Sequence, residues 1–141
     1  MPKAIQAFCQ STEQTMPAGC GSLVRVALES LACKYRLTLE LLEKVTGHRL
    51  EVIHIVGGGS QNQLLCQFAA DACARPVYAG PVEATALGNV LAQAIADGTC
   101  ASWAEARQVV RAAFPLKTYE PRDTAAWDQA YRRFEQVLKK E

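Results

Sequence analysis

Residues 52–62 of the chain read VIHIVGGGSQN, and this stretch decides how the fold is organised. Its β-branched first half predicts a buried strand over residues 51–56, and the three glycines after it predict a sharp turn. Apolar residues at helical spacing then predict a helix over residues 61–74. Because glycine has no Cβ, a strand, glycine turn and helix in this order let an anionic ligand approach backbone N–H groups and a helix N-terminus. The stretch therefore predicts a nucleotide site.

The sequence on either side of this stretch predicts a single α/β domain over residues 1–141. A second strand is expected over residues 76–79, parallel to the first because a helix connects the two. Further helices are expected over residues 3–9, 22–46, 83–97, 102–114 and 124–139, and residues 117–121 are expected to be extended. The long helix is apolar on more than one face and should bury more than one face. Because two strands alone make a marginal sheet, we expect a short parallel β-α-β core with packing helices, from an α/β domain whose other strands are missing.

Composition argues against several classes of partner. The 15 Lys and Arg residues nearly balance the 14 Asp and Glu residues, for a formal net charge of +1, so bulk charge favours neither nucleic acid nor a membrane surface. No apolar run approaches the roughly 20 residues that a membrane span needs. The N-terminal residues lack the apolar segment of a signal peptide. A cytoplasmic protein is expected.

The six cysteines predict neither a metal site nor a disulfide. They are Cys9, Cys20, Cys33, Cys66, Cys73 and Cys100. No CxxC motif occurs, and neither histidine lies at metal-ligand spacing from a cysteine. Cys66 and Cys73 share one expected helix, in which seven residues rise about 10.5 Å, whereas a disulfide needs Cα atoms within about 7 Å. Cys9 and Cys20 flank a loop that could bring them together, but reduced thiols are expected in the cytosol.

The glycine turn fits some nucleotide-binding signatures better than others. A P-loop needs a lysine after its glycines, and no lysine lies between Lys44 and Lys117. A Rossmann fingerprint has three glycine positions. Gly57 and Gly59 match the first two, but Asn62 occupies the third. The adenosine loop of the actin-like ATPase fold is the third signature, and there we expect Asn62 one turn into the helix, with a donor and an acceptor for an adenine edge or ribose. A β-α turn whose glycines serve packing alone is the remaining alternative.

Three segments together resemble the C-terminal domain of the FGGY carbohydrate kinases. They read HIVGGGSQNQLL at 54–65, QFAADA at 67–72 and GPVEATALGN at 80–89, and the similarity extends from about Ile5 to Phe114. The resemblance implies a partial RNase H-like (actin-like ATPase) domain. It also implies a parent enzyme that transfers the γ-phosphoryl group of Mg·ATP to a sugar hydroxyl. The third segment favours members that act on O1 of L-rhamnulose, with fuculose or xylulose kinases as alternatives.

The resemblance also implies roles for individual residues. Those matching the nucleotide-binding motif are Gly57, Gly58, Gly59, Ser60 and Asn62, and those matching the second, loop-ordering motif are Glu83, Thr85, Gly88 and Asn89. We expect Glu83 to order its loop and to cap its own helix rather than to touch substrate. Asp71 is expected to be structural, as a polar residue on a mostly buried helix.

This chain lacks the segments that carry catalysis in the family, and their absence limits the activity expected of the chain alone. Phosphoryl transfer needs a base, Mg²⁺ ligands and donors to the β- and γ-phosphates. In the family these come from an N-terminal domain and from the first strands of the C-terminal domain, which precede the matching segment. We therefore expect no catalytic residue, no metal ligand, weak or no binding of ATP, and no kinase activity from this chain alone. A non-catalytic nucleotide-binding or oligomerisation module is the alternative, and a homodimer through an exposed sheet edge or apolar helix face is expected.

Overall fold

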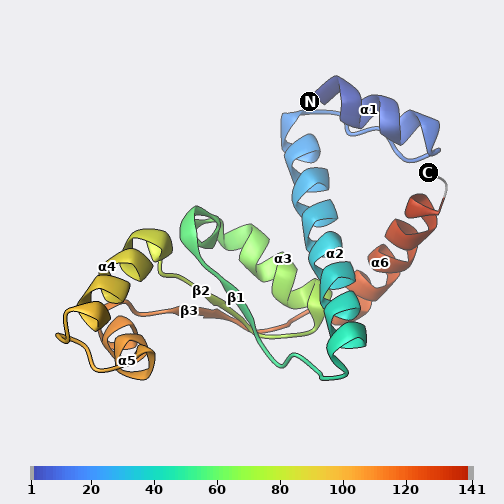
Figure 1. The fold of residues 1–141 in the computed structure, drawn as a ribbon. Helices are drawn as coiled ribbons and strands as arrows, with labels where there is room; N and C mark the ends of the chain where they lie inside the picture. The colour runs from blue at the N-terminus through green and yellow to red at the C-terminus, as the bar shows by residue number, and fades with distance from the viewer. Residues whose placement is uncertain (1, 140–141) are drawn as a thin grey trace.

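The structure is a computed structural model that describes residues 2–139, and it is an α/β fold with six α-helices and one small sheet in that part of the chain (Figure 1). The elements in order are α1 (Pro2–Ser11), α2 (Cys20–Thr46), β1 (Ile53–Ile55), the 3₁₀ helix η1 (Gly57–Gln61), α3 (Gln63–Cys73), β2 (Val77–Ala79), α4 (Ala84–Ala96), α5 (Trp103–Ala113), β3 (Lys117–Tyr119) and α6 (Thr124–Leu138). The expected helices and the first two strands are confirmed, with bounds shifted by a few residues.

The sheet has three strands in the order β1-β2-β3. β1 and β2 are parallel, with Ile53 opposite Val77, as the connecting helix predicts. β3 pairs antiparallel with β2, so that Tyr119 also lies opposite Val77 and Lys117 lies opposite Ala79. The expectation of a two-stranded sheet is wrong on this point. The extended segment expected at residues 117–121 contains β3, but its pairing with β2 was not predicted, because the two strands lie far apart in the sequence.

α3 forms the middle layer of the molecule. On one side its small residues pack against the sheet, in a cluster of Cys66, Ala69, Ala70, Val77, Ala79 and Tyr119. On its other side α2 and α6 pack against it, in a second cluster of Ala32, Cys33, Phe68, Ala72, Trp127 and Tyr131. The Phe68 and Trp127 rings lie 5.1 Å apart between centroids. The sheet, α3 and the α2–α6 pair therefore form three successive layers (Figure 1).

A hydrogen bond to the side chain of Asp71 connects the segment after β3 to this core. Asp71 lies on α3 with 7% of its surface exposed. Its Oδ1 accepts hydrogen bonds from the backbone N–H of Arg122, at 2.7 Å, and from Nε2 of Gln67, at 2.9 Å. The structural role expected for Asp71 is confirmed.

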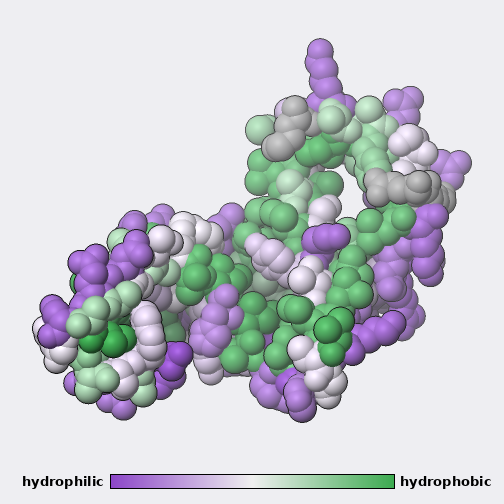
Figure 2. Space-filling view, in the orientation of Figure 1, coloured by the Kyte–Doolittle hydropathy of each residue, from purple (hydrophilic) through white to green (hydrophobic). Residues whose placement is uncertain are grey.

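Two apolar surfaces are left open. α4 and α5 contact each other beyond the sheet, away from α2 and α6, and no α4 residue in the described chain is buried. The long helix α2 buries Ala32, Cys33 and Leu39, but its other apolar residues, among them Val24, Leu31, Leu41, Leu42 and Val45, remain exposed. Figure 2 shows hydrophobic side chains gathered along α2. The second apolar face that the sequence expects to be buried is therefore exposed in this chain.

The cysteines are unpaired, and two helix ends carry residues typical of those positions. All six cysteines are free, and only Cys20 is exposed. Gly47 ends α2 with φ of +70°, and the Asp123 side chain caps α6 by accepting from the backbone N–H of Ala126. None of the helices within residues 2–139 combines the length and the apolar character that crossing a membrane requires.

Candidate functional site

The glycine turn is a short 3₁₀ helix, η1, that begins directly after β1. Gly57 has φ of +73°, a conformation that side chains disfavour, and its N–H donates to the carbonyl of Pro81 at 3.0 Å. The hydroxyl of Ser60 donates back to the carbonyl of Gly57 at 2.7 Å and closes the turn. Gly57 is therefore required by the backbone of the chain itself.

Gly58 differs from Gly57 because no backbone strain and no contact within residues 2–139 requires a glycine there. A Cβ at Gly58 would have no atom within 4 Å, whereas one at Gly59 would make an ordinary contact with Ile55 at 3.7 Å. Gly58 also lacks the positive φ of Gly57. The turn therefore presents bare backbone to the outside at Gly58, which favours close approach of a ligand over a role in packing alone.

Asn62 is the N-cap of α3, not a residue one turn inside the helix. Its Oδ1 accepts a hydrogen bond from the backbone N–H of Leu65 at 3.1 Å. The expected position is wrong because η1 takes up residues 57–61, and α3 begins only at Gln63. The side-chain oxygen of Asn62 therefore serves the helix, and the side-chain amide nitrogen is the group that can donate to a ligand.

A second turn lies beside the first. Gly80 has φ of +112°, is joined to Pro81 by a cis peptide bond, and donates from its N–H to the carbonyl of Ile55 at 2.9 Å. The carboxyl ends of β1 and β2 and their two turns therefore lie together. Ligands of open α/β sheets bind at this end of parallel strands.

The loop-ordering residues lie next to the second turn, on α4 or at its start. Glu83 occupies the N-cap position of α4 but makes no side-chain cap hydrogen bond, so the expected cap is not formed. Thr85, Gly88 and Asn89 lie within α4, outside the residues that line the cavity described next. Their role in ordering the loop stays a prediction.

A cavity of about 310 Å³ lies between the two turns and β3. Its lining residues come from the first turn and α3 (Ser60, Gln61, Gln63), the second turn (Ala79, Gly80, Pro81, Val82) and the segment around β3 (Phe114, Pro115, Lys117, Tyr119). Of the nucleotide-binding residues predicted from sequence, Ser60 lines this cavity. The wall formed by the β3 segment was not predicted, because the pairing of β3 was not predicted.

The cavity is lined by one cationic side chain, that of the exposed Lys117. Nζ of Lys117 donates to Oε1 of Gln63 at 2.9 Å and lies 5.3 Å from the centroid of the Tyr119 ring. No acidic side chain is among the lining residues, and the first turn of α3 carries none. The only ionisable groups in the lining are therefore a lysine and a tyrosine, beside a helix N-terminus with a positive partial charge.

Cys66 lies beneath the glycine turn. It is fully buried, and its Sγ contacts the carbonyls of Gly59 and Ser60 at 3.9 and 3.8 Å. Burial raises the pKa of the Cys66 thiol, and the positive charge of Lys117 acts in the opposite direction. A neutral buried thiol supports the turn by packing and is a poor nucleophile.

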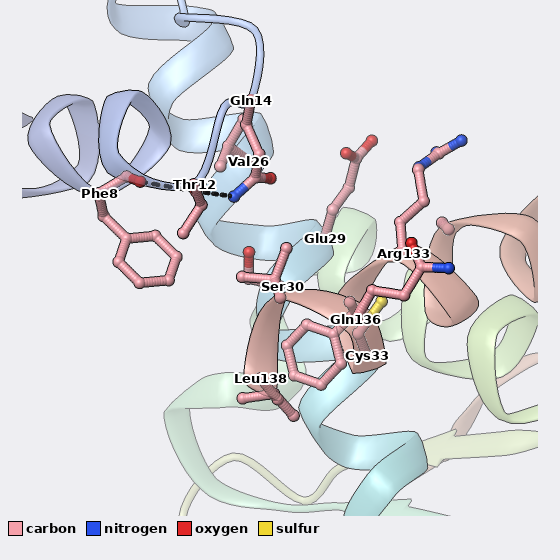
Figure 3. Close-up of a pocket in the computed structure, with 13 residues that line it drawn as sticks. Phe8, Thr12, Gln14, Val26, Glu29, Ser30, Cys33, Arg133, Gln136 and Leu138 are labelled. Atoms are coloured by element: carbon pink, nitrogen blue, oxygen red, sulfur yellow. Dashed lines mark hydrogen bonds between the residues drawn. The ribbon is translucent and has the colours of Figure 1, made fainter. Parts of the chain in front are cut away.

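A larger hollow of about 480 Å³ lies between α1, α2 and α6 (Figure 3). Several of its polar groups are already engaged, since Thr12 donates to the carbonyl of Phe8, Gln14 donates to Thr12, and Glu29 pairs with Arg25 at 2.6 Å. It contains no part of the glycine turn. The smaller cavity is therefore the better candidate site.

Side chains that could serve as metal ligands are not clustered in the part of the chain that the structure describes. Within residues 2–139, no group of three or more His, Cys, Asp or Glu side chains is placed to hold a metal ion. None of these residues is therefore assigned to the metal that accompanies ATP in the family.

Comparison with known proteins identifies the family. The model of the FGGY family of carbohydrate kinases, C-terminal domain, matches residues 1–96. The chain is 46% identical over 139 residues to a rhamnulokinase of Bacteroides thetaiotaomicron, covering 99% of this chain and 29% of that protein. It is 44% identical over 123 residues to a rhamnulokinase of Bacillus subtilis, covering 87% of this chain and 25% of that protein.

A third relative, a rhamnulokinase of Pectobacterium carotovorum, is 39% identical over 141 residues, covering 100% of this chain and 28% of that protein. The chain thus spans between 25% and 29% of the length of these three relatives. The match to the family model and the identity to several relatives confirm the resemblance found in the sequence: the chain belongs to the FGGY family of carbohydrate kinases.

Proposed function

We propose that this chain is the part of a rhamnulokinase that binds the adenosine end of ATP. The whole enzyme would transfer the γ-phosphoryl group of ATP to O1 of L-rhamnulose. The observation that carries the proposal is a cavity at the carboxyl ends of two parallel strands, lined by Ser60 of the same glycine turn that leaves the backbone bare at Gly58. The relatives named as rhamnulokinases support the choice of sugar.

The geometry suits the two halves of a nucleotide. Pro81, Val82 and Phe114, which line the cavity, offer flat or apolar contacts to a base. The N-terminus of α3 directs backbone N–H groups towards the phosphate end. The glycine turn directly precedes this N-terminus, and the Asn62 amide nitrogen can donate to the base or ribose.

The rest of the catalytic machinery is assigned to other parts of the enzyme. We assign the base, the magnesium ligands and most of the sugar pocket to segments that precede this one in the relatives, and no catalytic residue to this chain. The order α2-β1-α3-β2-α4 fits the later half of an RNase H-like domain. In that arrangement, the preceding strands of the domain would pair with the open edge of β1 and cover the exposed face of α2.

A calorimetric titration of adenosine and ADP tests the nucleotide site. The chain should bind ADP weakly, and Gly58→Val should abolish binding, because its side chain would occupy the space that the ligand needs. The matched control is Gly21→Val on α2, where an added Cβ also meets no atom within 4 Å. Equal binding by the wild-type chain and Gly58→Val would overturn the site.

A kinase assay tests whether catalysis requires segments of the enzyme outside this chain. The purified chain, given Mg·ATP and L-rhamnulose, should release no ADP above background. Turnover by the chain alone would contradict the assignment of catalysis to other segments.

The exposed faces support a second candidate function, that of an oligomerisation module. An open strand edge at β1 and the apolar face of α2 favour association of two copies when the chain is alone. Sedimentation equilibrium should then give the mass of a dimer, and Leu41→Glu on the exposed face should shift it towards the monomer. A monomer at all concentrations would exclude this function.

A further inference from the structure

Three polar side chains of α3 contact the β3 segment, residues 117–122, at regular intervals. Gln63, Gln67 and Asp71 are spaced by four residues, so they lie along one stripe of the helix, which we call the α3 stripe. The hydrogen bonds run from Nζ of Lys117 to Oε1 of Gln63 at 2.9 Å, from Nε2 of Gln67 to the carbonyl of Glu120 at 2.9 Å, and from the N–H of Arg122 to Oδ1 of Asp71 at 2.7 Å. The α3 stripe therefore follows the β3 segment from one end to the other.

Gln67 joins the middle of the stripe to its buried end. Its Nε2 donates both to the carbonyl of Glu120 and to Oδ1 of Asp71, each at 2.9 Å, so the amide uses both of its hydrogens. Both groups that face Nε2 are acceptors, and this determines the orientation of the amide. Asp71 is 7% exposed, whereas Gln67 is half-buried. The contact of Gln67 with the β3 segment is thus fixed to a buried carboxylate.

The stripe begins in the candidate cavity and leaves it. Gln63 and Lys117 are among the lining residues, but Gln67 and Asp71 are not. β3 is a three-residue strand at the edge of the sheet, and it pairs with β2 through three pairs of residues. A pairing as short as this is marginal by itself. The position of the β3 wall therefore depends on hydrogen bonds that lie outside the cavity.

We propose that Gln67 and Asp71 are positioning residues, whose hydrogen bonds keep the β3 segment where it forms a wall of the candidate cavity. The consequence for nucleotide affinity rests on the proposed function. A ligand that contacts this wall and the hydrogen bonds that hold the wall favour the same closed arrangement, so each stabilises the other. If the β3 segment opens in most molecules, the apparent affinity falls to the fraction that stays closed.

Hydrogen exchange followed by mass spectrometry tests the positioning role without any ligand. Gln67→Glu keeps the size of the side chain but sets carboxylate oxygens against two acceptors, one of them the Asp71 carboxylate. Exchange in residues 117–122 should rise about tenfold, because two hydrogen bonds are lost. Exchange in α2 should stay at the wild-type rate. A residue that only stabilised the fold as a whole would change both segments alike.

Matched variants separate loss of the hydrogen bonds from loss of packing. Gln67→Met removes the donors without adding a charge, and should raise exchange in residues 117–122 about threefold. Asp71→Asn added to Gln67→Glu should restore part of the protection, since the new amide can donate to the carboxylate at position 67 and still accept from Arg122. Gln108→Glu, on the exposed surface of α5, is the charge-matched control and should leave residues 117–122 unchanged.

Calorimetry with ADP tests the link to the ligand. Gln67→Glu should weaken ADP binding about tenfold, although the side chain does not line the cavity, because the closed arrangement is less populated. Saturating ADP should in turn slow exchange in residues 117–122 of the wild-type chain. The control Gln108→Glu should bind ADP as the wild type does.

The outcomes distinguish the positioning role from the nucleotide function. Faster exchange confined to residues 117–122, together with weaker ADP binding, supports both. ADP binding by the wild type that is unchanged in Gln67→Glu overturns the positioning role and leaves the nucleotide function. Absence of ADP binding by the wild type removes the nucleotide function. In that case exchange that rises only in residues 117–122 of Gln67→Glu still supports the positioning of the wall, and exchange that is unchanged or rises throughout the chain overturns it.

Discussion

The carboxylate of Asp71 on α3 accepts a hydrogen bond from the backbone N–H of Arg122, three residues after the end of β3, at 2.7 Å. This bond holds the β3 segment against the core. Since β3 forms one wall of the candidate site, a buried carboxylate outside the site contributes to the shape of the cavity.

Asp71→Ala should lower the free energy of unfolding by about 1–3 kcal/mol, because the partly buried N–H of Arg122 loses its acceptor. Urea denaturation followed by circular dichroism measures this. Asp71→Asn keeps an acceptor oxygen and should cost less. The control is Glu51→Ala, which removes an ion pair of 3.4 Å with Arg49 on an exposed side chain and should cost well under about 1 kcal/mol. Equal losses at Asp71 and Glu51 would contradict the anchoring role.

The glycine turn gives a matched pair of substitutions. Gly57→Ala should destabilise the chain by about 1–2 kcal/mol, because alanine is strained at φ of +73°. Gly58→Ala should be neutral or slightly stabilising, since its Cβ meets nothing and the unfolded chain loses freedom. Thermal melts of the two variants decide the matter. A larger loss at Gly58 than at Gly57 would show that the turn has a different conformation.

The contact between Phe68 and Trp127 holds α3 and α6 together. Phe68→Ala should cost about 3–5 kcal/mol, since it removes a buried ring and leaves a cavity. Val45→Ala, at a side chain 84% exposed on α2, should change stability by less than about 0.5 kcal/mol. Denaturant titration of both variants tests this, and a small loss at Phe68 would mean that α6 is not packed on α3.

Two buried thiols make stability fall at alkaline pH. Burial raises the pKa of Cys33 to about 11 and that of Cys73 to about 12, from 9.0 for an ordinary thiol. The unfolded chain therefore releases these protons at lower pH than the folded chain does. The contribution is complete below pH 9 and declines as pH rises from about 9 towards 12.

Urea midpoints measured from pH 7 to pH 11 should fall less steeply in the variant Cys33→Ala/Cys73→Ala than in the wild type. Tyrosines and lysines contribute equally to both chains, so the difference in slope reports the two thiols. Cys100→Ala serves as the control for removing a buried thiol elsewhere in the chain. If the urea midpoints of all three chains fell with pH at the same rate, the raised pKa values of Cys33 and Cys73 would be contradicted.

Much of the fold could be predicted because its signals are local. The β-branched run before Gly57 predicts β1, and the apolar spacing after it predicts α3. The connecting helix predicts the parallel pairing of Ile53 with Val77. Asp123 caps α6 and Gly47 ends α2, and both follow the local preferences of their residue types.

The errors lie where the outcome depends on neighbours in space. Asn62 became an N-cap because the glycines wound into a 3₁₀ helix instead of turning directly into α3. Glu83 makes no cap because residue type favours a cap only where the backbone brings the side chain to the helix N–H groups. Neither outcome is visible in a linear pattern.

The amino-acid sequence by itself determined the family, the order of the helices and of the first two strands, and the glycine turn, because these depend on short motifs and on periodicity within single segments. Only the tertiary structure decided that Lys117 and Tyr119 lie beside that turn. Their placement depends on β3 pairing with β2 and on the Asp71 carboxylate holding the β3 segment to α3. Both are contacts between segments distant in the sequence, where no local pattern records the partner.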